Sequence, residues 1–479
     1  MKSAADLIQA PAYAVSVQSP RRMWKVAGSL GVTGLTAFTT GLFLPVPMAS
    51  AAAFLIFCIS MWITATVPEW WPALAFFLVA VVFHIAPAET VFSGFHSTTF
   101  WLLFSGAVMG AAISHTGLAK RAATILAGML GTRYASAITG IVLFSVALAF
   151  IMPSGMGRIV LLLPITAAVA DHMGYRPGGN GRIGMLMAAA FSSFLPTFAI
   201  LTSNAPNLIL SGMAENLYGL HISYGRYLLV NFPLLGALKS VLLIRLILWM
   251  FPDRDPVRSA SSERRLSPMS GPERRLAVVL GLCLLLWTTD GLHHISPAWV
   301  GMAAALYCLW PGANLTSKDC LNAQINYGSL LFVAGVIGLG AVVFSTGLGQ
   351  VVVKGLSAHA GFSPAHPVWN VSALAGISTL VAIVTNLAGV PATMTPLAGD
   401  LAHITGLSLE TVLLTQVFGF SNTFLPYQAP PLIFAMQTAD LPTGAVTRLC
   451  FALFLISALV LTPLSFLWWY VLGLLSSGT

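Results

Sequence analysis

The sequence has 479 residues, of which 57% are hydrophobic and only 8% are Asp, Glu, Lys or Arg, and its formal net charge is +8. Soluble globular proteins carry about 25% charged residues, so this chain has too few charges to cover a water-exposed surface, and lipid must solvate most of it. The positive charge does not indicate a nucleic-acid partner, because the basic residues stand between apolar runs, where membrane proteins keep their cytoplasmic arginines.

Eleven apolar runs in the sequence are typical of membrane-spanning helices. A helix needs about 20 residues to cross the hydrocarbon core of a bilayer. The sequence therefore predicts an all-α polytopic membrane protein. In chain order the runs lie near residues 27–46, 50–67, 70–86, 99–115, 184–215, 225–250, 276–290, 297–311, 328–345, 409–438 and 444–474.

Two further apolar segments, 135–172 and 367–404, are interrupted at their centres by small and polar residues. The first interruption covers Pro153–Arg158 and the second covers Thr385–Gly389. Irregular backbone at membrane depth persists only where protein or a water-filled cavity satisfies its polar groups. We therefore expect two re-entrant hairpins whose tips reach a central cavity.

The basic residues orient the chain in the membrane. The N-terminal segment 1–26 is basic, and the long polar segment 251–275 carries six arginines. The positive-inside rule places both in the cytoplasm, which agrees with six crossings between them if the first hairpin does not cross. We expect halves at 27–250 and 276–479, a cytoplasmic N-terminus, an external C-terminus and a place in the inner (plasma) membrane.

An internal repeat relates the two halves. Residues 98–118 and 328–348 both end in Thr-Gly-Leu, and a predicted hairpin follows each of them. The long runs 184–215 and 409–438 come next, and each is interrupted by Ala-Pro with Leu-Ile shortly after it. The first copy enters from the cytoplasm and the second from outside. This order predicts an inverted repeat with discontinuous helices, the construction of secondary transporters that work by alternating access.

The breaks in these helices carry the chemistry. A half-helix that starts inside the membrane points unpaired N–H groups and a positive dipole end at the cavity, which favours an anion. Arg158 adds a charge at one break, and such a charge is usually functional, although snorkelling or helix capping is the alternative. Freed carbonyls could hold Na⁺. Side chains at the breaks that can donate to carboxylate or sulfate oxygens are Ser154, Ser203, Asn204, Thr385 and Asn386.

The two predicted hairpin tips and the two Ala-Pro turns carry a resemblance to a known family. The tips read Ser154-Gly155-Met156, shortly before Arg158, and Thr385-Asn386-Leu387. Further matching segments are Trp62–Thr64 with Pro68, Gly117–Arg121, Leu161–Pro164, Pro396, Ala205–Asn207 and Ala429–Pro431. From about Trp62 onward the chain resembles the divalent anion/sodium symporters, the dicarboxylate, citrate and sulfate carriers of the ion transporter superfamily. That family has a Ser-Asn-Thr tip in each hairpin and Thr-Pro-Pro-Asn turns.

The resemblance implies a homodimeric carrier of small anions, with Na⁺ as the coupling ion and no other cofactor. Relative to the family, the first tip has lost an amide and a hydroxyl oxygen, and Arg158 repels a nearby cation, so we expect weak or absent sodium dependence. Possible Na⁺ ligands are Ser154, Asn204, Thr385 and Asn386. The implied substrate-binding residues are Ser154, Gly155, Arg158, Ser203, Asn204, Asn207, Thr385, Asn386, Ala429 and Pro430.

Three functions are consistent with these features. The first is secondary active transport of a dicarboxylate, sulfate or related oxyanion. The second is an anion exchanger or an arsenite-type permease of the same superfamily. The third is a membrane receptor or enzyme that does not transport. No enzyme is expected, because the acidic residues lie mostly in predicted loops and helix ends and assemble no catalytic set. The five cysteines are scattered without a CxxC spacing, which argues against a disulfide framework or a zinc site.

Overall fold

A computed structural model describes residues 20–475 except 65–66, 120, 122–123, 126–132, 153 and 256–267. The described residues are almost all helical or in short turns, and they contain no strand. Seven helical segments within them are long and apolar enough to cross a membrane, and several shorter apolar helices accompany these. The prediction of an all-α polytopic membrane protein is confirmed.

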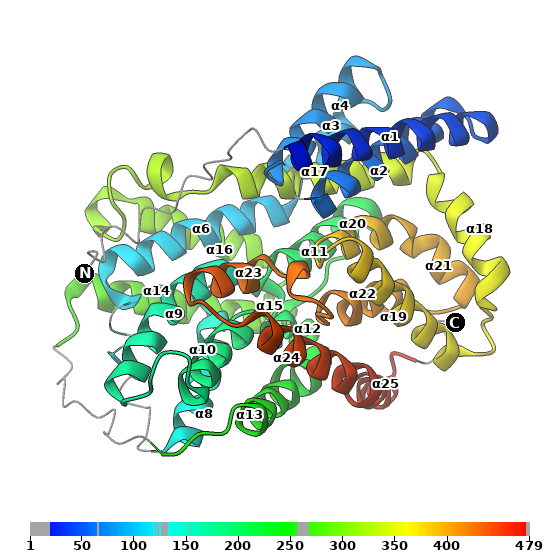
Figure 1. Cartoon of the computed structure of the whole chain (residues 1–479). Helices are drawn as coiled ribbons and strands as arrows, with labels where there is room; N and C mark the ends of the chain where they lie inside the picture. The colour runs from blue at the N-terminus through cyan, green and yellow to red at the C-terminus, as the bar shows by residue number, and fades with distance from the viewer. Residues whose placement is uncertain are drawn as a thin grey trace.

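The first group of helices packs around α17 (Tyr327–Ser345), and its N-terminal members lie together at one edge of the molecule (Figure 1). Two glycines of α17 allow this close packing. A Cβ on Gly335 would lie 2.3 Å from the Ala73 Cβ, and one on Gly338 would lie 2.2 Å from the Val91 carbonyl oxygen. Small residues permit such backbone approach between membrane helices. The group comprises α1 (Pro20–Phe43), α2 (Val46–Thr64), α3 (Trp70–Val82), α4 (Ala88–Val91), α5 (Ser93–His96) and α6 (Thr98–Thr116).

The first hairpin and the first broken helix follow in the chain. The hairpin consists of α8 and α9, and both of its arms pack against α10. Helix α10 ends at Ser192, and two turns of 3-10 helix intervene before the chain continues as α11. The bounds are α8 (Tyr134–Ala149), α9 (Gly155–His172), α10 (Asn180–Ser192), η1 (Pro196–Ala199), η2 (Leu201–Ser203), α11 (Ala205–Tyr218), α12 (Tyr224–Asn231), the π-helical η3 (Phe232–Leu238) and α13 (Lys239–Met250).

The second half begins with helices that pack on the first group, since α16 lies along α6 and α14. Buried Asp290 caps α12 of the first half, because its carboxylate accepts from the Tyr224 N–H at 2.6 Å. The bounds are α14 (Gly271–Thr288), α15 (Asp290–His293), α16 (Pro297–Leu309), η4 (Pro311–Ala313), η5 (Cys320–Gln324), α17 (Tyr327–Ser345) and α18 (Leu348–Ala360).

A second hairpin and a second broken helix complete the chain. Helix α19 packs along α22, and the return arm of the hairpin is divided into α20, η6 and α21. The bounds are α19 (Pro367–Val384), α20 (Gly389–Met394), η6 (Thr395–Leu397), α21 (Ala398–Thr405), α22 (Leu409–Phe420), η7 (Pro426–Gln428), α23 (Pro430–Thr438), α24 (Thr443–Ile456), the π-helical η8 (Ser457–Leu461) and α25 (Thr462–Val471).

The same order of elements therefore occurs in both halves: a long helix, a hairpin, a broken helix and a final helix with a π-helical turn. The packing between the halves is reciprocal. Helix α11 of the first broken helix contacts α20 of the second hairpin, and α23 of the second broken helix contacts α9 of the first hairpin. Figure 1 shows α23 at the centre of the molecule, beside α9 and α10. The sidedness of the two copies, the count of eleven crossings and the positions of the termini stay predictions.

The boundaries differ from the sequence prediction in three places. The first break lies at 150–154, because α9 already begins at Gly155, and Arg158 is on its first turn. Helix α1 begins at Pro20 and α10 at Asn180, both earlier than predicted. Residues 1–19 and residues 256–267 of the linker 251–275 lie outside the described part of the chain.

Candidate functional site: two helix breaks with buried polar groups

Arg158 is the centre of the first cluster, and its side chain is fully buried. Nε and Nη2 donate to the Ser193 carbonyl at 3.0 and 2.8 Å. Nη1 donates to the Met152 carbonyl, and both Nη1 and Nη2 lie 3.2 Å from the Ser203 carbonyl. Nη2 also reaches Thr197 Oγ1 at 2.9 Å. The guanidinium therefore joins the hairpin tip to both ends of the break in the first broken helix.

Local sequence explains why the arginine can reach this position. Ser154 caps α9, since its Oγ accepts from the Gly157 N–H at 3.0 Å, which starts the helix directly after the tip. Gly155 lets the tip approach the break closely, because a Cβ there would lie 3.0 Å from Asn204 Oδ1. Arg158 then points from the first turn into the carbonyl ends of the broken helix.

Among the described residues, the charge of Arg158 has no acidic partner. The ion pairs found among the described residues join Arg121 to Glu273, Arg182 to Asp171 and Arg226 to Glu410, and none involves Arg158. All three of its nitrogens already donate to neutral protein oxygens. A buried charge is costly unless it is hydrogen-bonded or paired. The guanidinium thus supplies fixed positive charge behind the tip, and it has no nitrogen left over for a direct fork to a bound anion.

The remaining predicted residues of the first half lie in the same cluster. Asn204 Nδ2 donates to Thr197 Oγ1 at 3.0 Å and to Ser203 Oγ at 3.1 Å. Asn207 Nδ2 donates to two carbonyls of the break, Phe198 at 3.0 Å and Ile200 at 2.7 Å. Asn207 therefore stabilises the shape of the break. Ser154 differs from the others because it is exposed at the tip, where its hydroxyl proton can be donated to a ligand.

The predicted residues of the second half form a separate cluster. Asn386 Oδ1 accepts from the Gly389 N–H at 2.8 Å and so starts α20, and the Thr385 hydroxyl donates to the Val381 carbonyl at 2.7 Å. Ala429 is buried directly before α23, whereas Pro430 is exposed. Pro430 and the proline after it have no N–H. The start of α23 therefore offers fewer donors to an anion than the residue pattern implied.

Gln428 holds the second break, and the sequence analysis did not identify it. Its Oε1 accepts from the N–H groups of Phe424 and Leu425 at 2.7 and 2.8 Å. Its Nε2 donates to the Ala382 carbonyl at 2.8 Å, near the end of α19. A neutral amide thus ties the second break to the second hairpin, where Arg158 performs that task in the first half.

Lys239 is the second buried cation in this region, and the sequence analysis also missed it. Its Nζ donates to the Ser421 carbonyl at 2.6 Å, at the point where α22 ends. The two breaks lie side by side here, since the rings of Phe198 and Phe420 have centroids 5.7 Å apart. The available signal was a lysine inside the apolar run 225–250, because an ionisable residue within a membrane span is usually functional.

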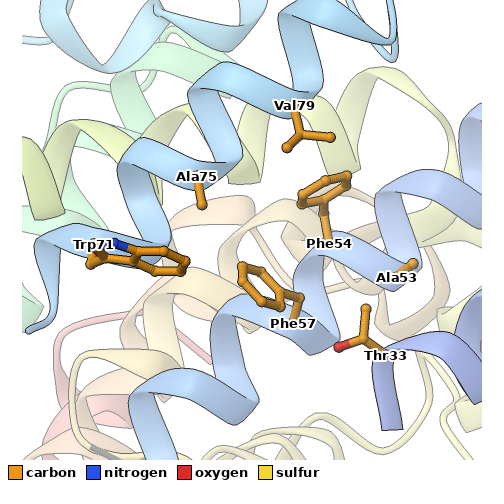
Figure 2. Close-up of a pocket in the computed structure, with 7 residues that line it drawn as sticks. All are labelled: Thr33, Ala53, Phe54, Phe57, Trp71, Ala75 and Val79. Carbon is orange, nitrogen blue, oxygen red and sulfur yellow. The ribbon is translucent and has the colours of Figure 1, made fainter. Parts of the chain in front are cut away.

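A hollow of about 310 Å³ lies elsewhere, between α1, α2 and α3. Figure 2 shows Phe54, Phe57 and Trp71 around it, with Thr33 at one side. Its lining is almost entirely apolar, so it offers an anion little to bind. Among the described residues there is also no group of three or more His, Cys, Asp or Glu side chains that could hold a metal ion.

The fold has apolar helices of membrane-spanning length, two hairpins and two broken helices, and the breaks meet at buried polar groups. This arrangement is that of a multi-pass membrane transporter. The model of the family described as "Sodium:sulfate symporter transmembrane region" matches residues 32–475. The chain therefore belongs to this family, and it is a secondary transporter of small anions.

Individual relatives are distant. A "Membrane protein" of Cupriavidus necator is 27% identical over 360 residues, which cover 72% of this chain and 69% of that protein. The "L-tartrate/succinate antiporter" of Escherichia coli K12 is 25% identical over 293 residues, which cover 57% of this chain and 58% of the relative. Among solved structures, the Alcanivorax borkumensis YdaH transporter matches with a TM-score of 0.55 at 16% identity, over 90% of this chain and all of that chain. The last match supports the fold alone.

Proposed function

We propose that this protein exchanges small divalent anions, dicarboxylates in particular, across the membrane without sodium. The observation that carries the proposal is the position of Arg158. Its guanidinium occupies the place where carbonyls of the first hairpin tip and of the first broken helix converge. In the resembling family, the tip and the broken helix behind it build a sodium site.

The donor set at this place does not fit Na⁺. A sodium ion needs several hard oxygen ligands, but the carbonyl oxygens of Met152, Ser193 and Ser203 already accept from the arginine. A second positive charge beside the guanidinium would also be repelled in a medium of low dielectric constant. In this proposal the guanidinium of Arg158 takes the place of a bound Na⁺, and no step of the transport cycle requires sodium.

A fixed charge also favours exchange over net transport. When no anion is bound, the moving part of the carrier holds an uncompensated buried charge, and a charge within the bilayer is costly. A bound anion compensates it, so the loaded form moves more readily than the empty form. The relative named as an antiporter of L-tartrate and succinate, both dicarboxylates, is consistent with this behaviour.

The first half supplies most of the binding chemistry in this proposal. Exposed Ser154 and the N-terminus of α9 face the substrate from the tip, and the N-terminus of α11 faces it from the broken helix, with Arg158 behind both. The predicted inverted repeat then lets one half of each protomer move as a body in a homodimer. We place the protein in the inner membrane with its N-terminus in the cytoplasm.

Counterflow in proteoliposomes tests the proposal. Vesicles loaded with unlabelled succinate should accumulate labelled succinate equally well in sodium and in choline buffer, and empty vesicles should accumulate little. Citrate, sulfate and aspartate as internal anions would rank the substrates. A steep sodium dependence with a Hill coefficient above one, or uptake into empty vesicles as fast as into loaded ones, would overturn the exchange mechanism.

A further inference from the structure

We propose that Lys239 is a second fixed cation of the transport site, which serves the second helix break as Arg158 serves the first. The site would then carry two positive charges, the number that a dicarboxylate neutralises. This inference rests on the proposed function and adds to it the charge that the substrate must have.

The contacts of the two cations are equivalent in the two broken helices. Ser193 is the C-cap residue directly after α10, and Ser421 is the C-cap residue directly after α22. Arg158 donates to the first carbonyl at 2.8 Å and Lys239 donates to the second at 2.6 Å. Each cation therefore lies at the negative end of the first half of a broken helix, where a positive charge is favourable.

The surroundings of Lys239 are those of a buried functional group. The side chain is 1% exposed, and none of the ion pairs found among the described residues includes it. It is the first residue after the π-helical η3, which packs against η1 of the first break. Single π-helical turns occur often at functional sites. Lysine has three N–H donors, and the Ser421 carbonyl is the one acceptor found for them among the residues that the structure describes.

An unpartnered hydroxyl lies close by in sequence. Ser421, Asn422 and Thr423 form the start of the second break and are all buried. Thr423 is 2% exposed, and its Oγ1 has no hydrogen-bond partner among the described residues. A buried hydroxyl without a partner is rare and costs free energy unless a ligand or water satisfies it. The second break thus offers an unused polar group two residues after the carbonyl that Lys239 contacts.

Charge balance then selects the substrate. With two fixed positive charges, a bound dianion leaves the loaded site neutral, a monoanion leaves it at +1, and the empty site stays at +2. Each uncompensated charge adds to the cost of moving the site through the bilayer. The carrier should therefore move fastest with a dianion, slower with a monoanion and slowest when empty.

The alternative is that Lys239 only caps α22. Substitutions separate the two roles. Lys239→Gln keeps an N–H donor for the Ser421 carbonyl and removes the charge, Lys239→Met removes both, and Lys239→Arg keeps the charge. Lys354→Met is the matched control, because Lys354 is an exposed lysine on α18. The readout is the ratio of counterflow rates for succinate and monomethyl succinate in choline buffer, which compares a dianion with a monoanion of similar shape.

We expect the ratio to fall by about tenfold or more in both Lys239→Gln and Lys239→Met, and to stay near the wild-type value in Lys239→Arg and Lys354→Met. Wild-type counterflow in choline tests the proposed function separately, since it does not depend on any variant. An unchanged ratio in Lys239→Gln would show that the lysine acts as a cap and would overturn the inference. The inference would also be overturned if neither uncharged variant gave a monodisperse protein while Lys239→Arg did, because the role would then be structural.

Discussion

Replacing Arg158 by alanine is the strongest test of the first helix break. The change takes the arginine's N–H groups away from the Ser203 carbonyl and from Asn204 Oδ1. The carbonyls of Met152 and Ser193 also lose the arginine, but they keep the Ser154 N–H at 2.9 Å and the Thr197 hydroxyl at 3.4 Å. Each buried acceptor left without a donor costs about 1–3 kcal/mol. Water can reach the tip beside exposed Ser154, so we take the lower value for these two acceptors and expect a loss of roughly 2 kcal/mol from the stability of the break.

The effect on the substrate is electrostatic. A single charge about 8 Å from a dianion, at an effective dielectric constant near 20, contributes about 4 kcal/mol to binding. Screening and relaxation reduce this value, so Arg158→Ala should raise the apparent KM for succinate at least about 100-fold. Arg158→Lys should recover only part of the loss, because an ammonium group cannot span all of these acceptors as the planar guanidinium does.

The same variant should also change the dependence on cations. With the guanidinium gone, the carbonyl oxygens of Met152, Ser193 and Ser203 lose a positively charged donor, and a free lone pair on each becomes available to a cation as a hard oxygen ligand. We therefore expect sodium to stimulate residual uptake by Arg158→Ala and not uptake by the wild type. The assay is initial uptake into proteoliposomes in sodium and in choline at fixed membrane potential. Arg245→Ala is the control, since this arginine of α13 is exposed.

Normal transport by Arg158→Ala with an unchanged KM would refute the reasoning. It would show that the arginine only satisfies carbonyl groups of the break and has no influence on the anion. A loss of transport without any response to sodium would keep the electrostatic role and exclude the ion-replacement argument.

Three further predictions concern other contacts. Gly155→Ala should lower the transport rate about tenfold, because the new Cβ would lie 3.0 Å from Asn204 Oδ1. Gly110→Ala should be neutral, because a Cβ there would have no atom within 4 Å. Equal rates for the two variants in the counterflow assay would count against the close approach of tip and break. Gln428→Leu should lower the melting temperature of the purified protein by several degrees, because two N–H groups and the Ala382 carbonyl lose their partner, and an unchanged melting curve would contradict this. The pKa of Glu273 lies below its ordinary value because Arg121 donates to the carboxylate. The contribution of this contact to stability is therefore present at neutral pH and is lost as the pH falls through the lowered pKa. Melting curves of wild type and Glu273→Gln should differ at pH 7 and converge at low pH.

Hydrophobic patterning allowed most of the fold to be predicted. Long apolar runs with small or polar residues at their centres located both hairpins and both broken helices, because irregular backbone inside a membrane leaves such a signature. Exact helix starts were harder to predict. Ser154 caps α9, and Asn386 accepts from the first N–H group of α20. Both contacts depend on side-chain geometry that spacing does not reveal.

The candidate site was predicted in part. The residues named from the tips and turns do gather at the two breaks. The sequence did not show that the Arg158 guanidinium turns away from the tip surface. It donates instead to carbonyls of a segment 35 to 45 residues later in the chain. Lys239 and Gln428 were missed for a related reason. Both act on breaks through contacts between elements that are distant in sequence, and Gln428 has no charge to draw attention to it.

Both buried cations belong to the first half of the chain, although the helices recur in both halves. Ala392 lies three residues into α20, as Arg158 lies three residues into α9, and Thr462 follows η8 as Lys239 follows η3. A carrier that opens to both sides needs a similar backbone in its two repeats, but the charge that neutralises the substrate needs no such symmetry, because it travels with the site. Single substitutions can therefore add or remove this charge without changing the geometry of alternating access. In this way one fold can accommodate both sodium-coupled symport and sodium-free exchange.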